Sequence, residues 1–136
     1  MAGAIATTQN GRLTIDFTGA ASTDGGGIAA IANPEGQTLI ILSTTLYVSA
    51  NSTGAANLSA GIAADATTSA TDIINALAMA AAAGKAYNGH APQATAKTEI
   101  TAPALWTSTK YLTLTGSAST AGLAGKLMVE YVRVTE

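Results

Sequence analysis

The chain has 136 residues, a formal net charge of −2 and no cysteine, and only 10% of its residues are charged. An average soluble domain has about 25% charged residues. The lack of cysteine excludes disulfide bonds, thiolate catalysis and cysteine-ligated metal. Six scattered Lys and Arg residues argue against a nucleic-acid partner. So few charges are typical of a protein whose surface is covered by copies of itself or by another protein.

The length fits a single domain over residues 1–136, and residues 1–10 precede the first strand signal, so we expect them to form an N-terminal arm. No apolar stretch approaches the ~20 residues that span a bilayer. Met1–Thr8 also lacks the basic and apolar regions of a signal peptide. We therefore expect no membrane partner.

Alternating apolar and polar residues predict strands along most of the chain. The longest, Gln37–Ala50, is rich in β-branched residues and apolar on both faces, which favours a place inside a sheet, with a bend between Ser43 and Thr45. Asn33–Gly36 predicts a turn before it. The predicted strands are Arg12–Thr18, Ile28–Ala32, Gln37–Ala50, Ala55–Ala63, Thr98–Thr101, Lys110–Thr115 and Lys126–Thr135.

One segment has the pattern of a helix. Asp72–Ala82 places Ile73, Ile74 and Leu77 on one helical face, continues into an alanine run and stops at Gly84. By contrast, Gly19–Gly27 and Lys85–Lys97 lack periodicity, so these two segments are predicted to be loops.

Two parts of the chain resemble each other. TLYVSANSTGAANLSAGI and YLTLTGSASTAGLAGKLMV each combine an alternating strand, a turn of small residues at Asn51–Gly54 or Gly116–Gly125, and a second strand. Two ordinary hairpins are the simpler interpretation. The alternative is the two-fold Greek-key arrangement of a jelly roll. The repeated alternation predicts an all-β fold: an antiparallel β-sandwich of jelly-roll type with one short helix.

Candidate catalytic and metal-binding residues are isolated in the sequence. His90 is the only histidine and has no nearby carboxylate and nucleophile. Asp65 and Asp72 flank hydroxyl residues, but their spacing matches no calcium loop. Asp24–Gly27 lacks the lysine of a phosphate-binding loop. We expect no enzymatic activity, no metal and no cofactor.

The tryptophan and the four tyrosines are dispersed over five segments, which favours core or interface anchors over a stacking platform for sugars or bases. The interface candidates are Tyr47, Trp106, Tyr111 and Tyr131.

Over Gln37–Val134 the chain resembles a family of virion proteins. The pattern consists of a strand with a Tyr-Val core, a small-residue turn, an Asp/Thr/Ser connector before Asp72-Ile73-Ile74, and a final G-x-L-x-V-x-Y strand. It is similar to the small jelly-roll decoration (cement) proteins on the capsid exterior of tailed bacteriophages. The resemblance implies a structural protein made in the host cytoplasm, commonly a homotrimer, that binds the major capsid protein on the virion surface.

The alternative function is a carbohydrate-binding or adhesin module of a head or tail fibre. Such a module would favour clustered aromatic residues beside Asp or Asn on one sheet face. The sequence does not show such a cluster.

Overall fold

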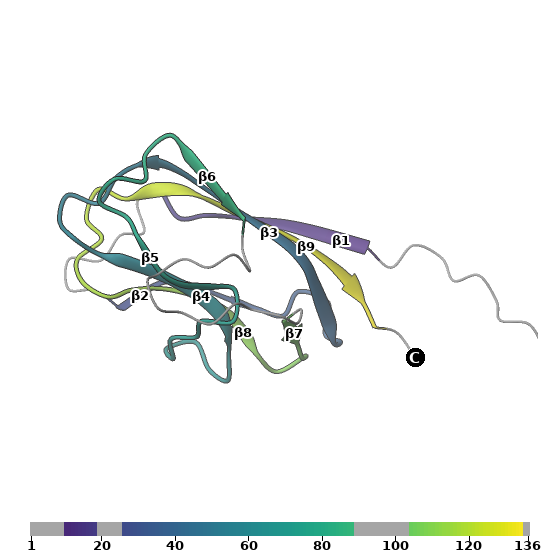
Figure 1. The fold of residues 1–136 in the computed structure, drawn as a ribbon. Coiled ribbons are helices and arrows are strands. Elements are labelled where there is room, and N and C mark those ends of the chain that lie inside the picture. Colours follow the sequence, from purple (N-terminus) through teal and green to yellow (C-terminus); the bar gives the residue numbers. More distant parts are fainter. Residues whose placement is uncertain (1–9, 19–25, 89–103, 135–136) are drawn as a thin grey trace, which may run out of the picture.

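The structure, a computed structural model, describes residues 10–18, 26–88 and 104–134. These residues form two antiparallel sheets that pack face to face as a sandwich (Figure 1). The five-stranded sheet has the order β1-β9-β3-β6, with β7 also paired to β3, and the four-stranded sheet has the order β2-β8-β4-β5. The strands are β1 (Asn10–Asp16), β2 (Gly26–Ala32), β3 (Leu39–Ala50), β4 (Asn57–Ala63), β5 (Ile74–Ala78), β6 (Lys85–Asn88), β7 (Leu105–Trp106), β8 (Tyr111–Gly116) and β9 (Ala124–Arg133).

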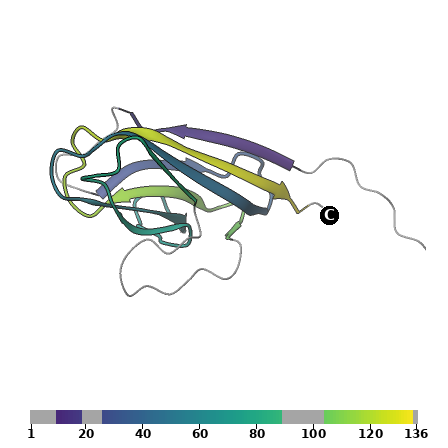
Figure 2. The ribbon, with the colours of Figure 1, turned by 45° about the horizontal axis from the view of Figure 1, so that its top comes forward.

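Apart from the two-residue strand β7, the strands follow jelly-roll order. β1 and β2, β3 and β4, β5 and β6, and β8 and β9 are each consecutive in the chain but lie in different sheets. Among the described strands, only β4 and β5 are consecutive and paired with each other, so most of the chain wraps around the core instead of folding into local hairpins (Figure 2). The predicted antiparallel sandwich of jelly-roll type is confirmed.

The two similar sequence segments are not hairpins. β3 pairs with β9 and β4 pairs with β8, so each small-residue turn crosses from one sheet to the other. The two crossing turns lie against each other, because Thr53 N donates to Ala121 O (2.8 Å) and Ser117 N donates to Asn57 O (2.9 Å). The hairpin interpretation is wrong, and the two segments form the paired Greek-key connections.

The predicted helix over Asp72–Ala82 is also wrong. Ile74–Ala78 forms β5 beside β4, and hydrogen bonds from Ile73 N to Ala60 O and from Met79 N to Ala56 O hold its flanks. An alanine run has high helix propensity but little side chain to bury, so pairing with a neighbouring strand overrides the propensity. The described residues contain no helix, and so none long and apolar enough to cross a membrane.

Other differences are local. β6 occupies the start of the predicted loop Lys85–Lys97 and pairs with β3, and β7 was not predicted. β3 lies inside its sheet as expected, and its register shifts between Ile41 and Ser43, close to the predicted bend. Residues 1–9 of the predicted arm, loop residues 19–25 and 89–97, and the predicted strand Thr98–Thr101 lie outside the described residues; residue 10 begins β1.

A single apolar core fills the space between the sheets. Trp106 is fully buried there, and its indole Nε1 donates to Lys110 O (2.9 Å), so the one polar atom of the ring is satisfied. The largest fully buried side chains are Phe17, Leu39, Ile41, Leu46, Leu58, Ile73, Ile74, Met79, Trp106, Leu112, Leu114 and Leu127.

Over β4 and β8, the outer face of the four-stranded sheet is covered by the β4–β5 connection, residues 64–73. Thr113 Oγ1 donates to Thr68 O (3.2 Å), and the hydroxyl oxygens of Ser69 and Thr115 lie 2.7 Å apart. Gly61 permits this close approach, because a Cβ there would lie 2.7 Å from the backbone nitrogen of Asp72. Thr113 and Thr115 are therefore buried, although strand alternation directs them away from the core.

Candidate interaction surface

In contrast, the outer face of the five-stranded sheet is exposed along β1 and β9. Alternate residues of a strand point to the same face, and the outward residues of these two strands are exposed over most of their length. They are Arg12, Thr14 and Asp16 on β1, and Lys126, Met128 and Glu130 on β9. We call this surface, with the outward residues of β3, the open face.

The register of the strands arranges the open face in three rows. Two rows are charged, and the row between them is not. From one end of the sheet to the other, the rows are Arg12–Glu130–Ser43, Thr14–Met128–Thr45 and Asp16–Lys126–Tyr47. Each charged row holds one positive and one negative side chain, and the signs on β1 and β9 are reversed between the two rows. The four charges cancel, so the open face is electrically neutral with an uncharged centre.

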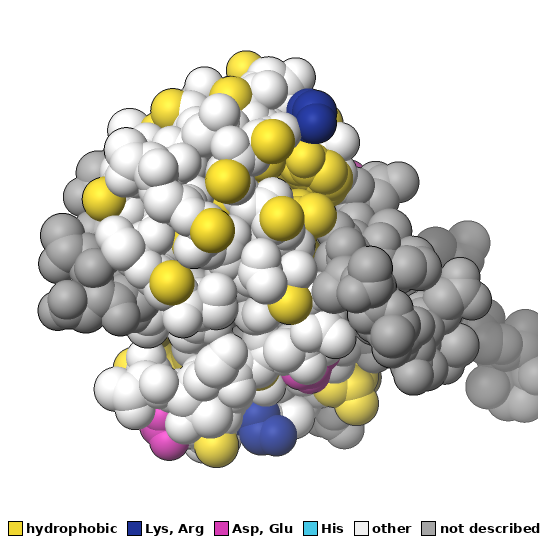
Figure 3. Space-filling view, turned by 60° about the vertical axis from the view of Figure 1, so that its left-hand side comes forward, with side chains coloured by type: hydrophobic (Ala, Val, Ile, Leu, Met, Phe, Trp, Pro, Cys, Tyr) yellow, Lys and Arg dark blue, Asp and Glu magenta, His cyan; other side chains and the backbone are white. Residues whose placement is uncertain are grey.

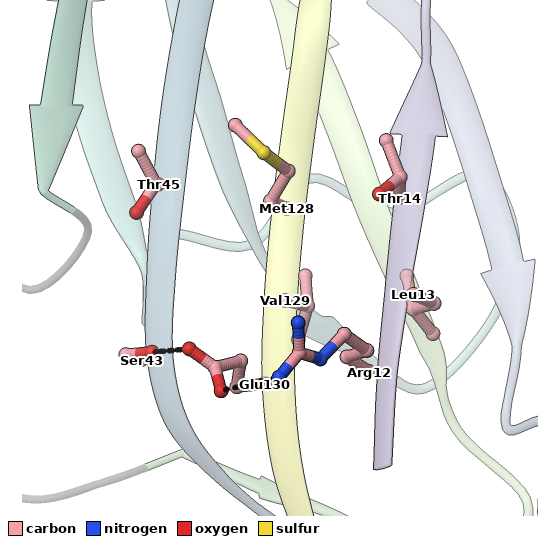
Figure 4. A pocket seen from close by; sticks show the side chains of 8 residues that line it. All are labelled: Arg12, Leu13, Thr14, Ser43, Thr45, Met128, Val129 and Glu130. Atoms are coloured by element: carbon pink, nitrogen blue, oxygen red, sulfur yellow. Dashed lines mark hydrogen bonds and ion pairs between the residues drawn. The ribbon is translucent and has the colours of Figure 1, made fainter.

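The charged rows are only weakly tied within the chain. Arg12 Nη2 lies 3.8 Å from Glu130 Oε2, and the two side chains are 82% and 58% exposed. Ser43 Oγ donates to the other carboxylate oxygen of Glu130 at 3.3 Å (Figure 4). Exposed ion pairs of this kind contribute about 0–1 kcal/mol. These charged groups therefore keep most of their capacity to bind a partner.

Asp16 is held in its ionised form at the other charged row. The backbone N–H of Thr18 donates to its Oδ1 (3.0 Å) and, with the Thr18 hydroxyl and the charge of Lys126, lowers the pKa of this carboxyl group. All four side chains of the charged rows are therefore charged at neutral pH, and we call their alternating pattern of Arg12, Glu130, Asp16 and Lys126 the charge checkerboard.

A shallow hollow of about 260 Å³ lies within the open face. Thr14, Thr45 and Met128 surround it on the outward side, and Arg12 and Glu130 lie at one end (Figure 4). Met128 is 38% exposed and Tyr47 is 42% exposed, so the open face also carries two large, partly exposed hydrophobic side chains. The hollow therefore combines hydroxyl groups with neighbouring hydrophobic side chains, a mixture that is also found in protein interfaces.

Among the predicted interface aromatics, Tyr47 lies on the open face and Tyr111 is half-buried on β8. Trp106 and Tyr131 are buried within the chain's own fold, which accounts for their apolar surfaces. An interface role stays a prediction for Tyr47 and Tyr111. Sequence reasoning did not find Met128 or the charge checkerboard, because only the register between β1 and β9 brings these side chains together on one face.

A polar cluster closes one end of the sandwich. Glu35 Oε2 accepts hydrogen bonds from Tyr131 OH (2.6 Å) and Arg133 Nη2 (2.9 Å), while Arg133 Nη1 donates to Asn10 O (3.0 Å). The bonds from Arg133 and Tyr131 lower the pKa of Glu35, and burial together with Glu35 raises the pKa of Tyr131. The cluster ties the β2–β3 turn to β9 and to the start of β1, which is a structural role.

The candidate metal ligands do not converge. Asp65 Oδ1 accepts bonds from the backbone and hydroxyl groups of Thr67 and Thr68, and the Thr67 N–H contributes most to its lowered pKa. This carboxylate therefore caps a turn. The described residues contain no group of three His, Cys, Asp or Glu side chains placed to hold a metal ion. His90, and the Asp24–Gly25 part of Asp24–Gly27, lie outside the described residues.

Comparisons with protein-family models, with curated proteins and with solved structures find no match to this chain.

Proposed function

We propose that this chain is a structural protein of a tailed-bacteriophage virion that binds the capsid exterior as a homo-oligomer and stabilises it. The observation that carries the proposal is the jelly-roll strand order together with a side of the molecule on which charged side chains are few (Figure 3). The resemblance to decoration proteins supports the same role.

The composition of the surface supports binding to protein. Figure 3 shows a side of the molecule on which charged side chains are few and uncharged ones cover most of the area. Charged residues, Lys, Glu and Asp above all, are depleted at the centres of protein interfaces. Contacts made by such a surface are mainly apolar and hydrogen-bonded, so salt should weaken them little.

Oligomerisation is part of the proposal because it would make the protein selective for assembled capsids. A symmetric oligomer presents several equal contacts, and they act together only where the capsid lattice repeats the target at the right spacing. Linked contacts of this kind raise apparent affinity by about 10²–10⁴ without any new contact. The resemblance implies a trimer. The chain should therefore bind the capsid lattice and not the free coat subunit.

Co-sedimentation with purified capsids tests the proposal. Capsids of the encoding phage, prepared without this chain, are mixed with the purified protein at low and at high salt, and free coat subunit serves as the matched control. We expect saturable binding to capsids at both salt concentrations and a higher temperature of capsid disruption. Absence of binding would refute the proposal, and retention on a glycan array in its place would favour the fibre-adhesin alternative.

A further inference from the structure

We propose that the open face is a two-fold interface with a second copy of this chain. The axis lies in the plane of the interface and runs across the strands, along the row Thr14–Met128–Thr45. The proposed interface specifies which surface the copies use, and which symmetry relates them, in the self-association that is part of the proposed function. It rests on that function only for the expectation that the chain associates with itself.

The charge pattern is the main argument. A two-fold rotation about this row places each strand over its own copy and exchanges the two charged rows. Arg12 then faces Asp16 of the second copy, and Glu130 faces Lys126 of the second copy. Because of the symmetry each contact occurs twice, and every one joins opposite charges. Such complementarity fixes register and excludes wrong partners.

The zero net charge of the open face also supports a second copy of this chain as the binding partner. A face with a net charge repels its own copy, whereas the two charged rows here cancel within the face. A capsid surface would need no such self-matching pattern. The pattern therefore favours a second copy of this chain over an unrelated protein.

The shape of the open face agrees with the charges. Met128 stands on the proposed axis and is exposed beside the hollow bordered by Thr14 and Thr45. A side chain on a two-fold axis faces its own copy, so the two Met128 side chains meet at the centre of the proposed interface, and the hollow lies to one side of the axis, toward the row Arg12–Glu130–Ser43. The uncharged row becomes the centre of the interface and the charged rows become its rim, as in other stable interfaces.

A second axis also satisfies the charges but buries less surface. An axis parallel to the strands, between β1 and β9, would place Arg12 over Glu130 of the second copy. Only β1 and β9 would then overlap, whereas the axis across the strands superposes the whole width of the sheet, including β3 with Tyr47. Aligned face-to-face packing of complete sheets is a common arrangement.

The symmetry sets the stoichiometry. A two-fold contact uses the same patch on both copies and produces even-numbered assemblies. A trimer closes through two different surfaces, so it cannot use the open face in this way. We expect dimers, or hexamers where trimers also form through another surface.

A charge exchange on one row tests the interface. In the double variant Arg12→Glu/Glu130→Arg the cross-strand ion pair, the amino-acid composition and the net charge of the chain are all retained. About the proposed axis, however, every rim contact becomes a contact between like charges. The mass in solution is measured by light scattering coupled to size exclusion, and dissociation by sedimentation, with wild type expected at an even multiple of 13.4 kDa. We expect the double variant to dissociate roughly tenfold or more readily.

A quadruple variant that adds Asp16→Lys and Lys126→Glu inverts both rows and restores complementarity, so it should reassociate. Asp16→Lys removes the bond from Thr18 N, so thermal unfolding of each variant verifies the fold. Retained association of the double variant would overturn the proposed axis. A wild-type mass of one or three chains would overturn the interface itself. Capsid binding, measured separately, decides the proposed function regardless of either result.

Discussion

Gly61→Ala should destabilise the fold by displacing the connection that covers the four-stranded sheet. A Cβ at this position would lie 2.7 Å from Asp72 N, 2.8 Å from the carbonyl carbon of Ala70 and 2.8 Å from Thr71 N. All three contacts are with backbone atoms, which cannot rotate away as a flexible side chain does. The clash is relieved when residues 68–72 of the connection move away from the sheet.

The magnitude follows from what this movement breaks. The connection supplies two hydrogen bonds to β8, from Thr113 Oγ1 to Thr68 O and between the hydroxyls of Ser69 and Thr115. Each such bond contributes about 0.5–1.5 kcal/mol to stability. If the connection stays in place instead, overpacking costs about 1–3 kcal/mol. Either response lowers the free energy of unfolding by about 1–3 kcal/mol.

Urea unfolding followed by tryptophan fluorescence measures this change, because Trp106 is buried in the core. Gly27→Ala is the matched control, since a Cβ there meets no atom within 4 Å. Its free energy of unfolding should be unchanged or raised by up to about 1 kcal/mol. If Gly61→Ala is as stable as Gly27→Ala, the connection does not pack on the sheet as described.

Two further measurements test the core and the polar cluster. Phe17→Ala should lower the free energy of unfolding by about 3–5 kcal/mol because the ring is fully buried. The control Leu105→Ala, at a side chain that is 56% exposed, should change it by less than about 0.5 kcal/mol. Equal effects of the two substitutions would contradict the assigned core. Hydrogen bonds from Arg133 and Tyr131 lower the pKa of Glu35 from its ordinary value of 4.5, so the stability this group contributes is present above that pH and lost as the pH falls through the folded-state pKa. Unfolding measured from about pH 7 to about pH 3 should therefore show a shallower decline for Glu35→Gln than for wild type, and parallel curves would show that the cluster does not stabilise the fold.

The alternating pattern of the sequence was enough to locate most strands, because one face of each strand is buried. Leu13, Ile15 and Phe17 predict β1, and the β-branched residues of Gln37–Ala50 predict the long interior strand β3. Local patterns do not specify partners, however. The two small-residue turns have the composition of hairpin loops, and only the long-range pairing of β3 with β9 and β4 with β8 shows that they cross between sheets.

The same limit explains the false helix and the missed surface. Alanines after Ile74 favour a helix locally, and the competing partner, β4, lies more than ten residues earlier in the sequence. On the open face, Arg12 and Asp16 have the spacing of same-face residues, as do Lys126 and Glu130. Their checkerboard exists only once β1 is aligned with β9, which no local pattern determines.

The position of β9 has a consequence for how the chain folds during synthesis. β9 follows the other eight described strands in sequence, yet it lies between β1 and β3 in the five-stranded sheet. Until β9 has left the ribosome, β1 lacks its described partner strand, and the edge of β3 that pairs with β9 has unpaired backbone N–H and C=O groups. Sheets that depend on such distant pairing form slowly, and their unpaired edges attract other chains. Productive folding is therefore expected after synthesis of β9, with nascent chains most prone to aggregate just before it emerges.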